Sequence, residues 1–202
     1  MKNRPLPTDA GGGGREQAPI LVTCFEPFGG RSVNMSREAV LAMPESLGGR
    51  ALRKLCLPVV FGAAAETAAA AAERLGAAAV LCVGEAGGRK ALTPELAALN
   101  LRYARIPDNR GQTPVDEPVI PGGENALFST LPARSMAAAI TAAGLPCEVS
   151  YSAGAYVCND LFYGLLHFFR GTGTRCGFIH VPAEGFSPAE LARGLLAAAG
   201  AV

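Results

Sequence analysis

Short apolar runs alternate along the chain with longer, alanine-rich segments. The runs are rich in Val, Leu, Ile and Cys, and their length and bounding turn residues are typical of strands. The run at 78–84, AAVLCVG, has no alternating polar positions, which indicates a strand that is buried on both faces. We expect strands at residues 19–24, 51–57, 78–84, 147–151 and 175–181, with a short one at 96–101.

The segments between these runs have the composition and end signals of helices. Ser32 or Asn34 can cap the first of them, and Gly76 follows the second as a glycine stop. Ser187 and Glu190 have the spacing of a capping box at the start of the last one. The predicted helices cover residues 32–43, 62–75, 135–143, 155–169 and 187–199.

The alternation of strands and helices predicts an α/β fold, because strands separated by crossover helices pair in parallel and are covered on both faces. In such sheets a ligand usually binds beyond the carboxyl ends of the strands. Residues 85–131 interrupt the pattern with many Gly, Pro and Asp residues, and we expect loops and short strands there. A long irregular stretch inside a compact domain is usually functional or oligomeric.

The first 18 residues are polar, contain four consecutive glycines and lack the apolar run of a signal peptide. We expect a disordered tail at 1–18 and a single α/β domain at 19–202. No apolar stretch is long enough to span a membrane. Without a secretory signal, the unpaired cysteines favour a reducing, cytoplasmic location.

The charges are nearly balanced, with 18 Lys and Arg against 17 Asp and Glu. A net charge of +1 gives no electrostatic reason to expect nucleic acid or an anionic membrane as a partner. Two histidines and the absence of any CxxC spacing leave no zinc pattern, so we expect no metal. Reduced, buried thiols are expected for five of the six cysteines: Cys24, Cys56, Cys82, Cys147 and Cys176.

The sixth cysteine, Cys158, lies between a predicted strand and a predicted helix. A thiol in the first turn of a helix is close to the positive end of the helix dipole, which lowers its pKa and favours the nucleophilic thiolate. The free backbone N–H groups of that turn can also stabilise an oxyanion. Position alone favours a small buried side chain on a helix, so Cys158 is a candidate nucleophile that needs further support from a base.

His180 is the better of two candidate bases, because it ends an apolar strand near the edge of the sheet where Cys158 also lies. His167 follows Cys158 by nine residues on the same predicted helix, about 13 Å along its axis, which is too far for a hydrogen bond. A third group often orients the imidazole. The candidates are Glu95, Asp108, Asp116 and Glu117, of which Glu95 adjoins an apolar stretch and suits a buried orienting role.

Two glycine-containing turns follow predicted strands and could border a ligand. The turn GEAGGR at 84–89 matches neither a dinucleotide fingerprint nor a P-loop, but it allows a close approach of backbone to substrate. The turn FEPFGG at 25–30 carries two phenylalanines that could line a small apolar pocket. The alternative interpretation of both is a simple turn.

Several segments together resemble the pyroglutamyl peptidase I family, also called pyrrolidone-carboxylate peptidases. The segments run in order along the chain, and their combination is specific although no single one is. They are LVTCFEPFGGRSVNMSREAV (21–40), GEAGGRKALTPELAALN (84–100), ARIPDNRGQTPVD (104–116), TLP (130–132), SAGAYVCN (152–159) and GFIHVP (177–182).

The resemblance implies a cysteine exopeptidase that removes N-terminal pyroglutamate from peptides. It implies Cys158 as nucleophile, His180 as base and acid, and Glu95 as the residue that orients His180. It also implies an open three-layer α/β/α sandwich with a mostly parallel, twisted central sheet, a cytoplasmic homotetramer, and no metal or organic cofactor. The substrate pocket that it implies is formed by Phe25, Phe28, Asn34, Glu85 and Val157.

Four positions depart from the family pattern. Glu85 replaces a common Gln, Leu96 replaces the Arg after the glutamate, Cys24 replaces a Gly, and Asp160 replaces a frequent His. Glu85 matters most, because a carboxylate near the site could raise the pKa of Cys158 by like-charge repulsion. Two alternatives therefore stay open: a related cysteine amidase with a shifted substrate, and a non-catalytic binding module of the same fold.

Overall fold

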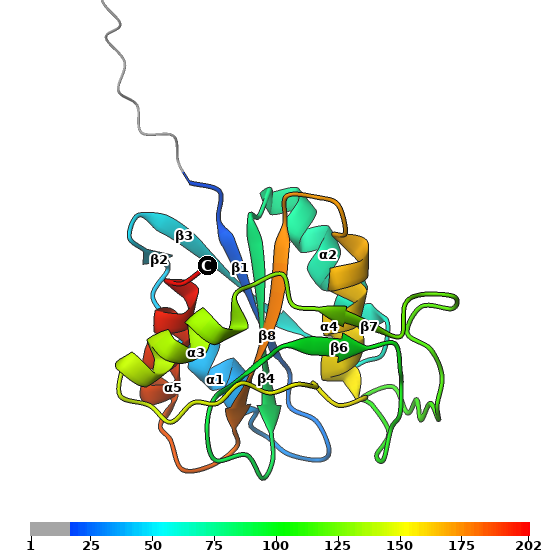
Figure 1. The fold of residues 1–202 in the computed structure, drawn as a ribbon. Helices are drawn as coiled ribbons and strands as arrows, with labels where there is room; N and C mark the ends of the chain where they lie inside the picture. The colour runs from blue at the N-terminus through cyan, green and yellow to red at the C-terminus, as the bar shows by residue number, and fades with distance from the viewer. Residues whose placement is uncertain (1–16) are drawn as a thin grey trace, which may run out of the picture.

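The computed structural model describes residues 17–202, which form a three-layer sandwich (Figure 1). The expectation of a disordered tail falls almost wholly on residues 1–16, which lie outside the described residues. The strands are β1 (Ile20–Phe25), β2 (Ser46–Leu47), β3 (Arg50–Leu57), β4 (Ala79–Ala86), β5 (Thr93–Glu95), β6 (Ala97–Leu99), β7 (Ala126–Phe128) and β8 (Arg175–Pro182). The helices are α1 (Met35–Leu41), α2 (Ala63–Leu75), α3 (Ala133–Ala142), α4 (Val157–Phe168) and α5 (Pro188–Ala199).

The central sheet has the order β2-β3-β1-β4-β8-β5. Strands β3, β1, β4 and β8 are parallel to one another, whereas the edge strands β2 and β5 pair antiparallel. Strand order reverses beside β1, whose neighbours are β3 and β4, and ligands of open α/β sheets bind at the carboxyl ends near such a point. The predicted mostly parallel α/β/α sandwich is confirmed.

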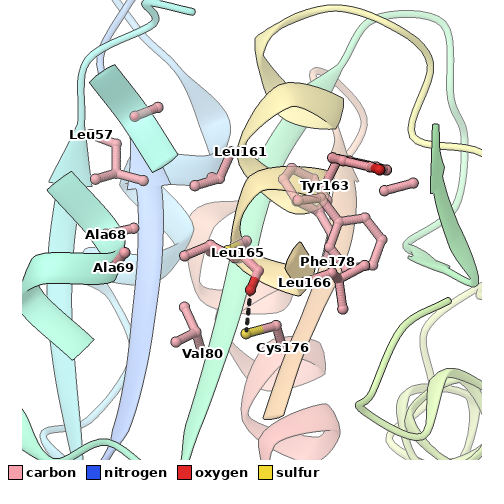
Figure 2. Packing of buried hydrophobic residues seen from close by; sticks show 14 of the residues in the cluster. Leu57, Ala68, Ala69, Val80, Leu161, Tyr163, Leu165, Leu166, Cys176 and Phe178 are labelled. Carbon is pink, nitrogen blue, oxygen red and sulfur yellow. Dashed lines mark hydrogen bonds between the residues drawn. The ribbon is translucent and has the colours of Figure 1, made fainter. Parts of the chain in front are cut away.

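Helices cover both faces of the sheet, so two apolar clusters form. Helices α1, α3 and α5 lie on one face, and α2 and α4 lie on the other (Figure 1). The core on the α2–α4 face relies on alanines of α2 and on leucines of α4, such as Leu161 and Leu165, which pack near Val80 and Phe178 (Figure 2). A Cβ built on Gly164 would lie 2.8 Å from the Ala65 Cβ, so the two helices are in close contact.

The local end signals work as predicted. The Asn34 side chain accepts a hydrogen bond from the Ser36 N–H at the start of α1, and Gly76 ends α2 in the left-handed region with φ 58°. Ser187 and Glu190 form the complete capping box of α5. No helix among residues 17–202 is long and apolar enough to cross a bilayer.

The predicted strand at 147–151 is wrong. This segment runs parallel to β5 but makes only two isolated bridges, Leu92 with Cys147 and Glu95 with Ser150. Pro94 lies between the two bridges and has no N–H to donate, so the hydrogen-bond ladder is interrupted there. The sheet therefore ends at β5, and the 147–151 segment leads on toward the start of α4.

Candidate active site

Cys158 is the second residue of α4 and therefore lies closer to the helix start than the sequence suggested. The preceding residue Tyr156 is extended, and Gly154 has φ 82°, which lets the chain turn sharply into the helix. The backbone N–H groups of the first turn have no partners within the helix. Cys158 is partly exposed, so its sulfur is accessible from the cleft beside it.

Two buried polar residues after Cys158 fix the start of α4. Asn159 accepts a hydrogen bond from the Leu99 N–H at 2.8 Å and donates to the Leu99 and Leu101 carbonyls. Asp160 accepts from the Arg102 Nε at 2.5 Å and from the Gly62 N–H at 2.7 Å. The helix start is thus bound to β6 and to the start of α2, which holds the thiol in a fixed position.

His180 and Glu95 form a buried pair beside this thiol. Strands β8 and β5 are neighbours, and the His180 Nδ1 lies 2.7 Å from the Glu95 Oε1. Glu95 is fully buried, and its carboxylate can only accept, so Nδ1–H donates and Nε2 is left free to take a proton. Of the four candidate orienting residues, the structure therefore brings only Glu95 to His180.

The sulfur of Cys158 lies over the strand next to His180. Gly84 on β4 pairs in register with His180 on β8, and a Cβ built on Gly84 would be 2.9 Å from the Cys158 Sγ. Only a residue without a side chain leaves this space to the sulfur. Cys158 and His180 both line one open cleft of about 720 Å³ at the carboxyl edge of the sheet.

Arg89 is a neighbour of this group that sequence reasoning did not single out. Its Nη1 lies 2.7 Å from the Glu95 Oε1, and it also donates to the Thr93 hydroxyl. The guanidinium compensates the buried charge of Glu95, which would otherwise be costly. The only signal in the sequence was its place at the end of the GEAGGR turn.

The predicted low pKa of Cys158 is wrong in direction. Burial and then the negative charge of Glu95 raise the pKa of the Cys158 thiol to about 12, against the lowering effect of Arg89. Burial also lowers the pKa of His180, although Glu95 opposes this. Desolvation outweighs the helix dipole, so the resting pair is a neutral thiol beside a neutral imidazole.

A small cavity of about 40 Å³ opens beside the thiol. All five residues of the expected substrate pocket line it together with Cys158: Phe25, Phe28, Asn34, Glu85 and Val157. Val59 and Tyr156, which were not expected, complete the wall. The Tyr156 ring packs edge-on against Phe61 and lies 6.3 Å from the Phe28 ring, so this wall is well supported.

Glu85 does not act on Cys158 as its position suggested. Its carboxylate accepts hydrogen bonds from the Arg31 guanidinium and, at 2.6 Å, from the Met35 N–H at the start of α1. Burial and then the charge of Glu95 raise the Cys158 pKa instead. The paired Glu85 therefore belongs to the wall of the small cavity.

The remaining candidates lie elsewhere. Asp108 accepts from backbone N–H groups, including that of Phe61, and supports a loop. Asp116 and Glu117 are exposed, and Glu117 pairs through its backbone with Arg102. His167 stacks on Tyr163 near the other end of α4, as expected of a structural histidine.

An open α/β sheet with a helix-start thiol, an adjacent imidazole and a buried carboxylate behind it is the arrangement of a cysteine hydrolase. The sequence model of the pyroglutamyl peptidase family matches residues 18–188. The chain belongs to the pyroglutamyl peptidase family.

Named relatives and solved structures agree with this assignment. The pyrrolidone-carboxylate peptidase of Gloeobacter violaceus is 49% identical over 81% of this chain and 80% of its own length. That of Aliivibrio fischeri is 43% identical over 91% and 92%. The crystal structure of pyroglutamyl peptidase I from Bacillus amyloliquefaciens superposes with a TM-score of 0.87 at 38% identity, covering 91% of this chain and 95% of that one. The predicted family is confirmed, and a non-catalytic module is not favoured.

Proposed function

We propose that this protein is a cysteine exopeptidase that removes N-terminal pyroglutamate from peptides. The observation that carries the proposal is the position of Cys158, which borders both the small cavity and the cleft that contains His180. The small cavity holds the lactam ring of the substrate, and the open cleft receives the rest of the peptide. An exopeptidase needs this pairing of a closed side and an open side.

Attack begins from the neutral pair. His180 Nε2 takes the Cys158 proton as the sulfur attacks the pyroglutamyl carbonyl carbon, so a free thiolate need not accumulate. The Glu95 carboxylate holds Nδ1–H and stabilises the imidazolium that forms. The carbonyl oxygen gains negative charge, and the unpaired N–H groups at the start of α4 stabilise it.

The second half of the reaction returns the enzyme to its starting state. The imidazolium of His180 donates its proton to the leaving amine as the C–N bond breaks, which leaves a pyroglutamyl thioester on Cys158. Neutral His180 then takes a proton from water, and the resulting hydroxide attacks the thioester carbonyl. Pyroglutamate leaves, and the proton returns to the sulfur.

Ring recognition uses few polar groups. Phe25, Phe28 and Val157 contact the apolar part of the ring, while Asn34 and Glu85 are the polar groups of the wall. A lactam has one N–H donor and one carbonyl acceptor, and a substrate that leaves the buried polar groups of the wall unpaired is rejected strongly.

We also propose, from the family resemblance, that the protein works as a cytoplasmic homotetramer. Light scattering after gel filtration tests the assembly.

The direct test is hydrolysis of pyroglutamyl-7-amido-4-methylcoumarin by the wild-type protein. We expect turnover at least about tenfold more efficient than with the six-membered lactam homologue, since one methylene changes pocket discrimination by that order. Glutaminyl and alanyl amides serve as open-chain controls. Efficient hydrolysis of one of these instead would favour the amidase with a shifted substrate, and no turnover of any would contradict the peptidase.

A further inference from the structure

The wall of the small cavity contains a buried carboxylate whose charge is balanced from outside the cavity. The Glu85 side chain is only 2% exposed, whereas the Arg31 side chain that pairs with it is 46% exposed. Arg31 lines the open cleft but not the small cavity, and Glu85 lines both. Arg31 thus reaches Glu85 from the solvent side.

The second partner of Glu85 belongs to the backbone. Its Oε2 accepts the Met35 N–H, which is the first residue of α1, and Asn34 at the helix cap lines the same cavity. Glu85 therefore connects β4 to the segment that carries Phe28 and Asn34. One full positive charge, that of Arg31, and the partial charge of a helix start balance the carboxylate.

We propose that Arg31 determines which rings the cavity accepts, by neutralising Glu85 so that the cavity favours an uncharged lactam over a cationic ring. The inference rests on the proposed function of the cavity. Arg31 acts through Glu85 and is therefore a positioning residue. Its removal leaves a buried carboxylate with only backbone partners, and the cavity wall becomes negative.

A proline ring provides the matching probe. Prolyl and pyroglutamyl groups have rings of the same size, but proline carries a secondary ammonium where pyroglutamate carries an uncharged lactam N–H. At about pH 6.5 the prolyl amine is protonated. An unpaired Glu85 attracts this cation through a short, poorly solvated path, while it offers no comparable gain to the lactam.

The experiment measures kcat/KM for pyroglutamyl and prolyl 7-amido-4-methylcoumarin and takes their ratio as the discrimination. We expect Arg31→Ala to lower this ratio at least about tenfold, mainly through a lower KM for the prolyl substrate. Arg31→Lys should keep the ratio within threefold of wild type. Arg31→Ala combined with Glu85→Gln should behave like Glu85→Gln alone, because Arg31 has no role once residue 85 is neutral.

Arg37→Ala is the matched control, since Arg37 is 44% exposed and pairs with Glu38 on the surface of α1. We expect it to leave the discrimination unchanged. If Arg31→Ala loses its fold, as judged by thermal melting, Arg31→Gln keeps the side-chain length and replaces it. An unchanged ratio in Arg31→Ala, or in Arg31→Gln where that variant replaces it, would overturn the inference. So would a loss of discrimination on removal of Arg31 that persists fully when residue 85 is Gln.

Calorimetry with 5-oxoprolinamide and prolinamide separates this inference from the proposed function, because it needs no turnover. A wild-type protein that prefers 5-oxoprolinamide, and an Arg31→Ala variant that loses the preference, would support the role of Arg31 even if peptide hydrolysis failed. A wild-type protein that hydrolyses the pyroglutamyl substrate, with an Arg31→Ala variant of unchanged preference, would overturn only the role of Arg31.

Discussion

Two buried glutamates flank Cys158, and each is paired with an arginine. Glu95 lies on β5 behind His180 and pairs with Arg89, whereas Glu85 lies at the end of β4 and pairs with Arg31. Both carboxylates are almost fully removed from solvent. The two pairs therefore use the same chemistry to keep a negative charge inside the protein.

The difference lies in the remaining partner of each carboxylate. Glu95 contacts His180, which can gain or lose a proton, so in the proposed mechanism its charge acts on the proton transfers of the reaction. Glu85 contacts the backbone N–H of Met35, which cannot titrate, so its charge can only shape the cavity. In the proposed mechanism, one type of ion pair therefore serves catalysis on one side of the thiol and recognition on the other.

The largest effect on activity is expected from neutralising Glu95, the glutamate that contacts His180. Glu95→Gln removes the charge that stabilises the imidazolium of His180, and we expect kcat to fall about 10³-fold with KM nearly unchanged. Steady-state kinetics with the pyroglutamyl amide measure this. Glu124→Gln, which removes an exposed partner of Arg170, is the control. A fall in kcat of less than about tenfold would contradict a catalytic role for Glu95 and leave no functional difference between the two glutamates.

A smaller but still large effect on activity is expected from a side chain at Gly84, the residue of β4 over which the Cys158 sulfur lies. A Cβ on Gly84 would lie 2.7 Å from Phe178 Cζ and 2.9 Å from the Cys158 Sγ, so Gly84→Ala must displace the sulfur. We expect kcat/KM to fall about 10²-fold, as for other small misplacements of a reacting group. Gly173→Ala is the control, because a Cβ there meets nothing within 4 Å and Gly173 lines neither the cleft nor the small cavity. Equal activity of the two variants would show that the sulfur is not held against β4.

Arg89→Met tests whether the catalytic pair is tuned by its arginine. Arg89 lowers the pKa of both His180 and Cys158, so its loss raises both pKa values. His180 must be neutral to accept the thiol proton, and a raised pKa keeps it protonated to higher pH. We expect the acid limb of the kcat/KM profile to move up by about half to one pH unit. A limb that stays in place, or moves down, would contradict this role; Arg37→Met is the control.

The smallest effect on activity is expected from Phe28, which belongs to the apolar wall of the small cavity. Phe28→Ala removes part of the surface that contacts the ring, and we expect KM to rise about fivefold with kcat within about threefold. Phe168→Ala, on an exposed site at the far end of α4, is the control. A fall in kcat without a change in KM would indicate that Phe28 supports catalysis, and would contradict its role in binding the ring.

Much of the fold followed from the pattern of the chain. The parallel strands, the helices and three of their end signals at Asn34, Gly76 and Ser187 were predictable because they depend on local composition. The edge of the sheet was not predictable. The antiparallel strand β5 is only three residues long, and the interruption beside it depends on how Pro94 meets the 147–151 segment, from which β6, β7 and α3 separate it in the sequence.

The residues that the structure brings together at the candidate site could be predicted from the sequence, but their electrostatics could not. Cys158, His180 and Glu95 were selected as candidates from residue type and position, and the family resemblance supplied the pocket residues. The sign of the Cys158 pKa shift was missed, because desolvation depends on packing that no local pattern reveals. Arg31 was missed for a related reason, because it meets Glu85 only after β1 and β4, which are distant in the sequence, come together. Arg89 is close to Glu95 in the sequence, but their contact depends on how the turn after β4 folds back to β5.

The central claim is that Cys158 is the nucleophile, and the kcat of Cys158→Ala on pyroglutamyl-7-amido-4-methylcoumarin tests it most directly. The account predicts a loss of at least about 10⁴-fold, as is usual when a covalent nucleophile is removed, with an unchanged melting temperature. Cys147→Ala, a partly exposed thiol away from the cleft, should stay within about twofold of wild type. Activity of Cys158→Ala within about tenfold of wild type would contradict the account.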